Sequence, residues 1–213
     1  MASDDRARGY WDRLAADYDR SMRLLGGPLP RTCELVAREV GPSDGVLEVA
    51  AGTGLFTSAL QTVAREVVAT DYSAAMVEQL EARGRREAWP NVVTLRRDLY
   101  ALGFESGAFD VVVAANVLHL VPDLPGAIDA LLHVLRPSGK LLVPTFLHAQ
   151  NRVARLSSRL VGLTGFPAPR RFDERSLRAA VERQGARVEH LEVVHGVVFP
   201  IGFVCARPPV CST

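Results

Sequence analysis

The sequence contains almost no lysine. Of its 25 basic residues only Lys140 is a lysine, and it lies in an expected turn, so we set Schiff-base chemistry aside. Cysteine is also scarce. The three cysteines form no CxxC pair and their number is odd, which is not the pattern of a disulfide framework, and we expect reduced thiols.

A metal-binding pattern and an excess of charge are both missing. The five histidines show no HxxxH or HExxH spacing, so no metal site is predicted. The net charge is +1 and the basic residues are scattered along the chain. A dedicated nucleic-acid binder concentrates its basic residues, so nucleic acid is not an expected partner.

No apolar run is long enough to cross a bilayer. The first residues, MASDDRARGYW, are polar and lack the apolar core of a signal peptide. Hydrophobic residues make up 48% of the chain and charged residues 23%, as in ordinary globular proteins. We therefore expect a cytoplasmic protein with a sizeable core.

Short apolar runs alternate with longer amphipathic segments from Val46 onward. This alternation is typical of βαβ units that build a parallel sheet, and runs that are apolar on both faces are typical of its buried strands. The expected strands are 46–50, 66–71, 92–97, 110–118 and 140–146, and the expected crossover helices are 55–64, 73–88 and 124–135. The motif RPSGK predicts a loop before the fifth strand.

The end of the chain predicts a hairpin. A helix is expected over 173–185, with Asp173 as its N-cap and Gly185 as its stop. The strands 186–196 and 197–206 are separated by a short glycine turn and should pair antiparallel. The fold class is therefore α/β, with a doubly wound, mostly parallel seven-stranded sheet and an antiparallel C-terminal hairpin.

Two additions to the sheet are expected within a single domain that covers 1–213. An N-terminal helical cap of about 1–44 contains the amphipathic segments 6–20 and 31–40. A lid-like insertion of about 147–171 follows the fifth strand. Both would lie near the carboxyl ends of the strands, where doubly wound sheets bind ligands.

The loop Ala50–Gly54 carries nothing larger than a threonine. Gly52 and Gly54 tolerate backbone angles that other residues avoid, and they allow a ligand to approach the amides of the following helix. Asp71 ends the second strand about 20 residues later, where a carboxylate can bind both hydroxyls of a ribose. The pair predicts a ribose-containing cofactor, either NAD or S-adenosylmethionine.

Two residues favour S-adenosylmethionine. The dinucleotide fingerprint needs a third small residue in the first turn of its helix, and Thr57 stands there. Glu48 lies just before the loop and would help to satisfy the cationic end of the cofactor through water or amides. NAD remains the alternative.

Five motifs, in order, resemble the class I S-adenosylmethionine-dependent methyltransferases, and in particular the ubiquinone and menaquinone methyltransferase-like branch. They are LEVAAGTG, VVATDYSAAMVEQL, RRDLYAL, FDVVVAANVLHLV and VLRPSGKLLV. The first departs from the family pattern because Ala50 replaces a glycine. The resemblance covers about residues 10 to 146.

The resemblance implies roles for further residues. Asp71 would bind the ribose, and Tyr72 and Met76 would pack around the adenine. Asp98 and the Leu99 amide would hydrogen-bond that base. The methionyl portion would be lined and held by Asn116, Leu118 and Tyr18, and Tyr10 and Trp11 would cover the pocket or fill the interface between helix and sheet.

Methyl transfer from a sulfonium needs alignment and exclusion of water more than a catalytic side chain. If the acceptor must lose a proton, His119 or His148 could accept it, because both follow strands at the carboxyl edge. The alternative is that both histidines are structural or partly exposed. His119 and His148 are the candidate catalytic residues.

The insertion bears on the acceptor. One helical stripe carries Arg152, Arg155 and Arg159, and another carries Val153, Leu156, Leu160 and Leu163. Such a basic amphipathic helix suits an anionic membrane or a cover over the acceptor, although a helix packed on the sheet with solvated arginines is the simpler alternative. Arg170 and Arg171 would extend the basic surface.

The sequence therefore predicts an enzyme that transfers a methyl group from S-adenosylmethionine to a small, apolar or lipid-like acceptor, at O, N, S or C, with S-adenosylhomocysteine as product. Two alternatives remain open. One is an NAD-dependent oxidoreductase, and the other is a methyltransferase-like protein that binds cofactor but only supports a partner.

Overall fold

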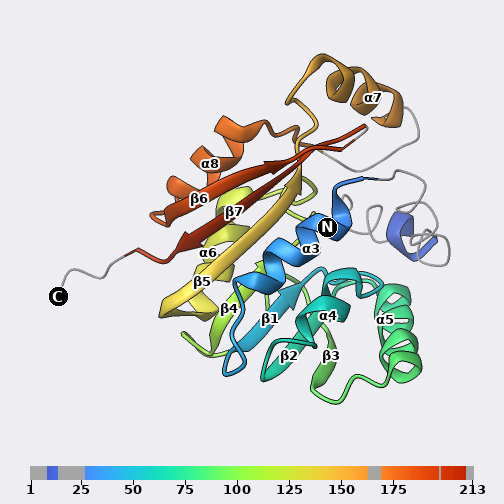
Figure 1. The fold of residues 1–213 in the computed structure, drawn as a ribbon, viewed down its shortest axis with the longest axis vertical. Helices are drawn as coiled ribbons and strands as arrows, with labels where there is room; N and C mark the ends of the chain where they lie inside the picture. The colour runs from blue at the N-terminus through green and yellow to red at the C-terminus, as the bar shows by residue number, and fades with distance from the viewer. Residues whose placement is uncertain (1–8, 14–26, 163–168, 197, 210–213) are drawn as a thin grey trace.

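The computed structural model describes residues 9–13, 27–162, 169–196 and 198–209 (Figure 1). Their centre is a seven-stranded sheet with the order β3-β2-β1-β4-β5-β7-β6. The first five neighbours in this order run parallel, and β7 pairs antiparallel with both β5 and β6. The predicted fold class is confirmed. The strands are β1 Gly45–Val49, β2 Glu66–Asp71, β3 Val92–Arg96, β4 Phe109–Ala114, β5 Leu135–Phe146, β6 Arg187–Val194 and β7 Ile201–Arg207.

Helices cover both faces of the sheet (Figure 1). The labelled helices are α3 Leu29–Arg38, α4 Leu55–Leu60, α5 Ala74–Glu87, α6 Leu124–Val134, α7 Arg152–Gly162 and α8 Glu174–Glu182. Their starts follow the expected caps. Ser73 Oγ accepts from the Met76 amide at 3.1 Å to begin α5, and Asp173 forms a capping box with Ser176 at the start of α8.

Alternate residues of the central strand β1 serve two hydrophobic cores. Leu47 packs with α6 and α8 residues such as Ile128 and Leu177 on one face. Val46 packs with α3, α4 and α5 residues, including Leu80, on the other. Every residue of β1 is buried, as expected for a parallel strand covered on both faces.

Several element boundaries differ from those expected. Helix α4 ends at Leu60, and β4 ends at Ala114 because Asn116 takes a left-handed conformation, with φ of 52°. The segment RPSGK belongs to β5, because Leu135 pairs with Phe109 before the register shifts. Finally, β7 begins only at Ile201, which leaves a connection of 195–200 in place of a short turn.

The two expected additions are described only in part. Residues 9–13 are helical, and Ser73 donates a hydrogen bond to Asp12, which ties this helix to the start of α5. Tyr18 lies outside the described residues, as do the side chains of 160–162. Among the helices described, none is long and apolar enough to span a membrane. A single domain with a cap of about 1–44 and an insertion of about 147–171 stays a prediction.

Candidate active site

The loop after β1 has an unusual backbone. Ala50, Gly52 and Gly54 all have positive φ, at 52°, 57° and 85°. The Ala51 amide is fixed to the Thr70 carbonyl of β2 at 2.9 Å. Because every second residue from Ala50 to Gly54 has a positive φ, the loop turns sharply from β1 into α4 at the carboxyl edge of the sheet.

Gly54 is required by packing as well as by φ. A Cβ on Gly54 would lie 2.6 Å from Leu80 Cδ1 and 2.9 Å from Trp89 Cη2. Both distances are shorter than carbon atoms can approach, so the missing side chain lets α5 pack closely against the loop. The position that a Cβ would take is filled by Leu80 and Trp89, and contact of the Gly54 backbone with the cofactor stays a prediction.

Asp71 joins the loop to β2. One carboxylate oxygen accepts from the Gly52 amide at 2.9 Å, and the other accepts from the Ser73 amide at 2.9 Å. Burial raises the pKa of Asp71, and these backbone hydrogen bonds oppose that rise. The structure thus brings together the two features on which the cofactor prediction depended. The Tyr72 amide adds a third backbone hydrogen bond, and because a carboxylate can accept about four, it retains capacity for a ligand hydroxyl.

Glu48 faces inward, toward α4. Its side chain is buried, and its carboxylate accepts from the Thr57 hydroxyl at 2.6 Å. Burial raises its pKa to about 8, with a further rise from Asp71 and an opposing effect of the Thr57 hydrogen bond. Thr57 occupies the position where a dinucleotide site would have a small residue, and it serves there as a partner for Glu48. Contact of Glu48 with the cationic end of a cofactor stays a prediction.

The residues expected around adenine line the next two strand ends. Met76 is buried at the start of α5, and Tyr72 lies at the end of β2, where its carbonyl accepts from Arg96 Nε at 3.0 Å. Asp98 is exposed beyond β3, and its carboxylate accepts from the Tyr100 amide at 3.0 Å. Leu99 packs on the core from the same turn.

The exit of β4 places Asn116 beside β5. Its amide donates to the Pro144 carbonyl at 2.7 Å, and its side-chain oxygen is buried with no hydrogen-bond partner among the residues described. An oriented acceptor of this kind suits a ligand donor such as an ammonium group. Leu118 is fully buried in the core, and its contact with the cofactor stays a prediction.

His119 and His148 come together at the ends of β4 and β5. Their ring centroids are 5.3 Å apart, and the His148 ring lies 4.6 Å from the Phe199 ring and 6.1 Å from that of Phe146. Burial lowers the pKa of His119 to about 3 and that of His148 to about 4. Both imidazoles are therefore uncharged at neutral pH.

Arg170 fixes the loop beyond β4. Its guanidinium donates to the carbonyls of Val121 and Pro122, and its amide donates to the His119 carbonyl at 3.4 Å. The side chain thus fixes the loop that follows His119, and its contribution to a basic surface stays a prediction. Sequence reasoning missed this role and also missed Phe199, because both residues reach the site only through tertiary contacts.

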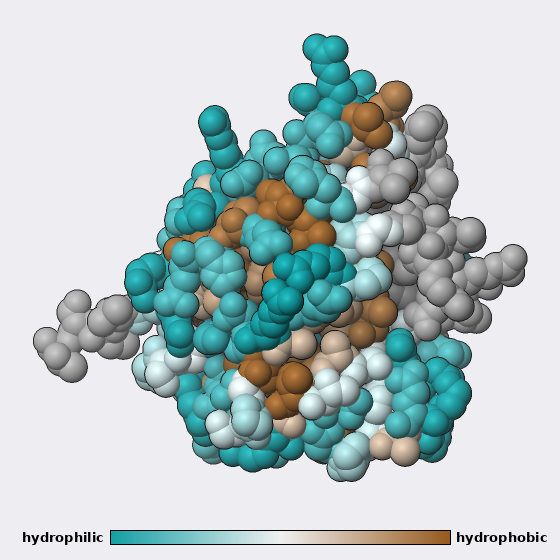
Figure 2. All heavy atoms as spheres, viewed as in Figure 1, coloured by the Kyte–Doolittle hydropathy of each residue, from teal (hydrophilic) through white to brown (hydrophobic). Residues whose placement is uncertain are grey.

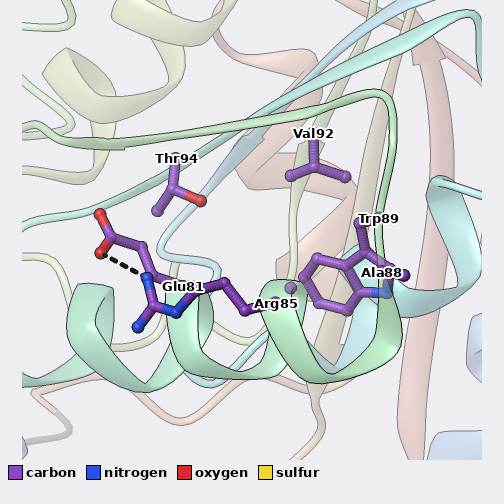
Figure 3. Close-up of a pocket in the computed structure, with 7 residues that line it drawn as sticks. Glu81, Arg85, Ala88, Trp89, Val92 and Thr94 are labelled. Carbon is purple, nitrogen blue, oxygen red and sulfur yellow. Dashed lines mark ion pairs between the residues drawn. The ribbon is translucent and has the colours of Figure 1, made fainter.

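A separate surface cleft lies away from this edge, between the end of α5 and β3 (Figure 3). Trp89 and Val92 line it beside Arg85 and Glu81, which form an ion pair at 3.6 Å. It holds none of the predicted site residues.

The comparisons with known proteins agree with this geometry. Residues 47–143 match a family model described as a methyltransferase domain. The chain carries a methyltransferase domain of the class I fold. The resemblance drawn from its five motifs is confirmed.

The methyltransferase domain has curated relatives among bacterial proteins. The chain is 33% identical over 147 residues to a demethylmenaquinone methyltransferase of Renibacterium salmoninarum. The match covers 68% of this chain and 60% of the relative. The chain therefore spans only about three fifths of that protein's length.

Solved structures share the fold of the methyltransferase domain, and their alignments cover more of this chain than residues 47–143. The complex of DhpI with SAH aligns with a TM-score of 0.74 at 20% identity, over 96% of this chain and 97% of that one. A SAM-dependent methyltransferase from Aquifex aeolicus aligns with a TM-score of 0.69 at 17% identity, over 92% and 98%. At such identities the likeness shows the fold.

Proposed function

We propose that this protein transfers a methyl group from S-adenosylmethionine to a small, apolar acceptor of the quinone type. One observation carries the proposal. The Asp71 carboxylate and the Gly52 amide meet at 2.9 Å, and this contact joins the carboxylate that we expect to bind the ribose to the glycine loop at the edge of the sheet. The match to a methyltransferase domain and the cofactor product in the DhpI complex support this choice of cofactor.

The cofactor would lie across the carboxyl ends of β1, β2 and β4. Asp71 would accept from the ribose hydroxyls, Tyr72, Met76, Asp98 and Leu99 would surround the adenine, and Asn116 would accept from the ammonium group. The buried, unsatisfied Asn116 oxygen fits this last assignment. When bound, the cofactor supplies a methyl group on a sulfonium, which is already a good leaving group.

The acceptor would lie against the aromatic cluster formed by His119, Phe146, His148 and Phe199. Because both imidazoles are neutral, the four rings of the cluster carry no charge that an apolar ring would have to desolvate, although the Arg171 cation is near enough to His148 to lower its pKa further. A neutral imidazole can still accept a proton from the acceptor, although a pKa this low makes it a weak base. We therefore assign the two histidines first to shaping the acceptor surface and second to proton transfer.

A lipid-like quinone is the acceptor class that we favour. The curated relative is a demethylmenaquinone methyltransferase, and an apolar, uncharged surface suits a quinone ring. A lipid acceptor would be met at a membrane, and the basic helix α7 is the part of the chain that suits peripheral contact with one.

Asp71→Ala tests the cofactor site. Calorimetric titration with S-adenosylhomocysteine should show about 100-fold weaker binding, because two hydrogen bonds to a charged group are lost at roughly 1.5 kcal/mol or more each. Asp44→Ala, which removes a carboxylate from a turn before β1, is the control. Unchanged affinity would contradict the placement of the ribose.

Turnover is tested with labelled S-adenosylmethionine and a short-chain demethylmenaquinone analogue. Label should appear in the quinone product of the wild-type protein and not with Asp71→Ala. Binding of NAD without binding of S-adenosylmethionine would favour the oxidoreductase alternative. Transfer that requires an added partner protein would favour the supporting role.

A further inference from the structure

Helix α7 presents its large apolar side chains outward. Ala154 and Ser158, one turn apart, are 0% and 7% exposed and form the inner face of the helix. Val153 and Leu156 are 59% and 62% exposed. At 100° per residue, Leu156 points almost directly away from the buried pair. An ordinary amphipathic helix on a globular protein buries its leucine and exposes its serine, and α7 does the opposite.

The charge around these apolar side chains has one sign. Residues 147–171 contain five arginines and no aspartate or glutamate. Arg152, Arg155 and Arg159 are exposed on α7, and they take part in no ion pair within the described part of the chain. By contrast, Arg178 of α8 is paired with Glu182 of the same helix at 3.2 Å. No described residue neutralises the charges of α7, so they are available to an anionic partner from outside the chain.

The base of α7 is fixed to the body of the protein. Asn151 caps the helix by accepting from the Ala154 amide at 2.8 Å. Two hydrogen bonds hold the preceding turn. The Ala149 amide donates to the Phe172 carbonyl at 2.8 Å, and the Gln150 side chain accepts from the Glu174 amide at 2.9 Å. The outward face of α7 is therefore presented in a defined orientation from the β5 end that also carries His148.

We propose that α7 docks on an anionic phospholipid surface, with Leu156 and Val153 inserted between headgroups and the arginines bound to phosphates. Exposed leucine and valine beside unpaired arginines match the two components of such a surface, an acyl boundary and a layer of negative charge. Figure 2 shows hydrophobic and hydrophilic atoms side by side at the end of the molecule formed by α7. The purpose of this docking rests on the proposed lipid-like acceptor, which would reach the site from the same surface.

Sedimentation with vesicles tests the docking directly. The full chain should bind vesicles of equal parts phosphatidylglycerol and phosphatidylcholine, and it should bind pure phosphatidylcholine far more weakly. Leu156→Ser should weaken binding about tenfold, because a leucine loses its burial. Replacing Arg152, Arg155 and Arg159 with glutamine should weaken binding about fivefold per arginine and should abolish the difference between the two vesicle types.

Matched variants elsewhere separate α7 from general effects. Val93→Ser removes an equally exposed valine, at 54%, from the edge strand β3 and should leave vesicle binding unchanged, whereas Val153→Ser should weaken it. A second control removes the same amount of positive charge from α5 and α8 by changing Arg85, Arg86 and Arg175 to glutamine. This variant should bind vesicles only slightly less than the wild type. Since Leu156 is exposed, circular dichroism of Leu156→Ser should match that of the wild type.

Three results would overturn the proposal. The first is absence of binding to anionic vesicles by the wild-type protein, and the second is binding that the α7 variants do not change. The third is a raised KM of Leu156→Ser for a water-soluble acceptor with vesicle binding intact, which would make α7 a cover over the site. The vesicle assay needs no turnover, so failure of cofactor binding or of transfer to a short-chain acceptor would remove the proposed function while leaving the docking result to stand by itself.

Discussion

The carboxyl edge of β1 and β2 differs from the carboxyl edge of β4 and β5 in how each treats its buried ionisable groups. At the first edge, Asp71 and Glu48 accept hydrogen bonds from two amides and a hydroxyl nearby. At the second, His119 and His148 lie among phenylalanine rings. The first edge suits a polar cofactor and the second a neutral, apolar acceptor.

Burial shifts the pKa values of the two edges in opposite directions. The pKa of Glu48 rises to about 8, so the buried acid keeps its proton, and the pKa of His119 falls to about 3, so the buried base loses its proton. Both groups become neutral. The two edges must therefore respond oppositely to pH, which gives a way to test the comparison.

Gly54→Ala should have the largest effect and should damage the first edge alone. We expect a loss of about 3 kcal/mol in the free energy of unfolding, because a left-handed alanine costs roughly 1–2 kcal/mol and overpacking adds roughly 1–3. Urea denaturation measures it. Gly103→Ala is the control, since φ is 71° there and no atom lies within 4 Å of the new Cβ.

The control should lose only about 1 kcal/mol, because it carries the backbone penalty without the collision. Equal losses in the two variants would show that the contacts with Leu80 and Trp89 relax without cost. The first edge would then be less tightly built than its distances indicate.

Glu48→Gln should change the pH dependence of stability on the alkaline side. Because the folded pKa is raised, the folded state holds a proton that the unfolded state loses above pH 4.5, and stability falls as pH rises from about 4.5 to about 8. The variant should remove about 2 kcal/mol of this decline between pH 5 and 6.5, at roughly 1.4 kcal/mol per pH unit. Denaturation midpoints between pH 5 and 9 measure it, with exposed Glu78→Gln as the control.

His119→Gln should flatten the opposite slope. The pKa of His119 is lower in the folded state than in the unfolded state. Between pH 6.5 and 3 the unfolded state therefore binds a proton that the folded state does not bind, and stability falls as pH drops through this range. The variant should lose less stability than the wild type between pH 6.5 and 4, by about 2 kcal/mol. Exposed His133→Gln should keep the wild-type slope, and a parallel decline in His119→Gln would contradict the burial argument.

The sequence predicted the first edge more completely than the second. The glycine loop, Asp71 and the Ser73 cap are local signals, because each depends on neighbours in the chain. The contact between Asp71 and Gly52 also follows from parallel strands that end at one edge. By contrast, the cluster of His148 with Phe199 joins β5 to the connection before β7, and no periodicity reveals such a pairing.

Direction was also hidden from sequence. The periodicity of α7 predicted two stripes, but the structure was needed to show that Ala154 faces inward and Leu156 outward. Likewise, Thr57 was notable only as a residue too large for a dinucleotide site, and its hydrogen bond to Glu48 became visible with the packing of α4 on β1. Periodicity indicates which residues share a face, and only tertiary contacts decide where that face points.

Ala50→Gly should have the smallest effect and should show how much strain the first edge stores. Ala50 and Ala88 share a φ of 52°. Glycine at such a position stabilises the folded state by about 1–2 kcal/mol, because it removes the backbone strain. It also stabilises the unfolded state by about 0.4–1 kcal/mol, because the unfolded chain becomes more flexible. Ala88 is exposed, whereas the Ala50 methyl packs on the core. We therefore expect Ala88→Gly to stabilise the protein by about 1 kcal/mol and Ala50→Gly by about half of that, measured by urea denaturation. A destabilised Ala50→Gly beside a stabilised Ala88→Gly would mean that the alanine is retained at the loop for its contact with the core, and that the left-handed turn there costs the fold little.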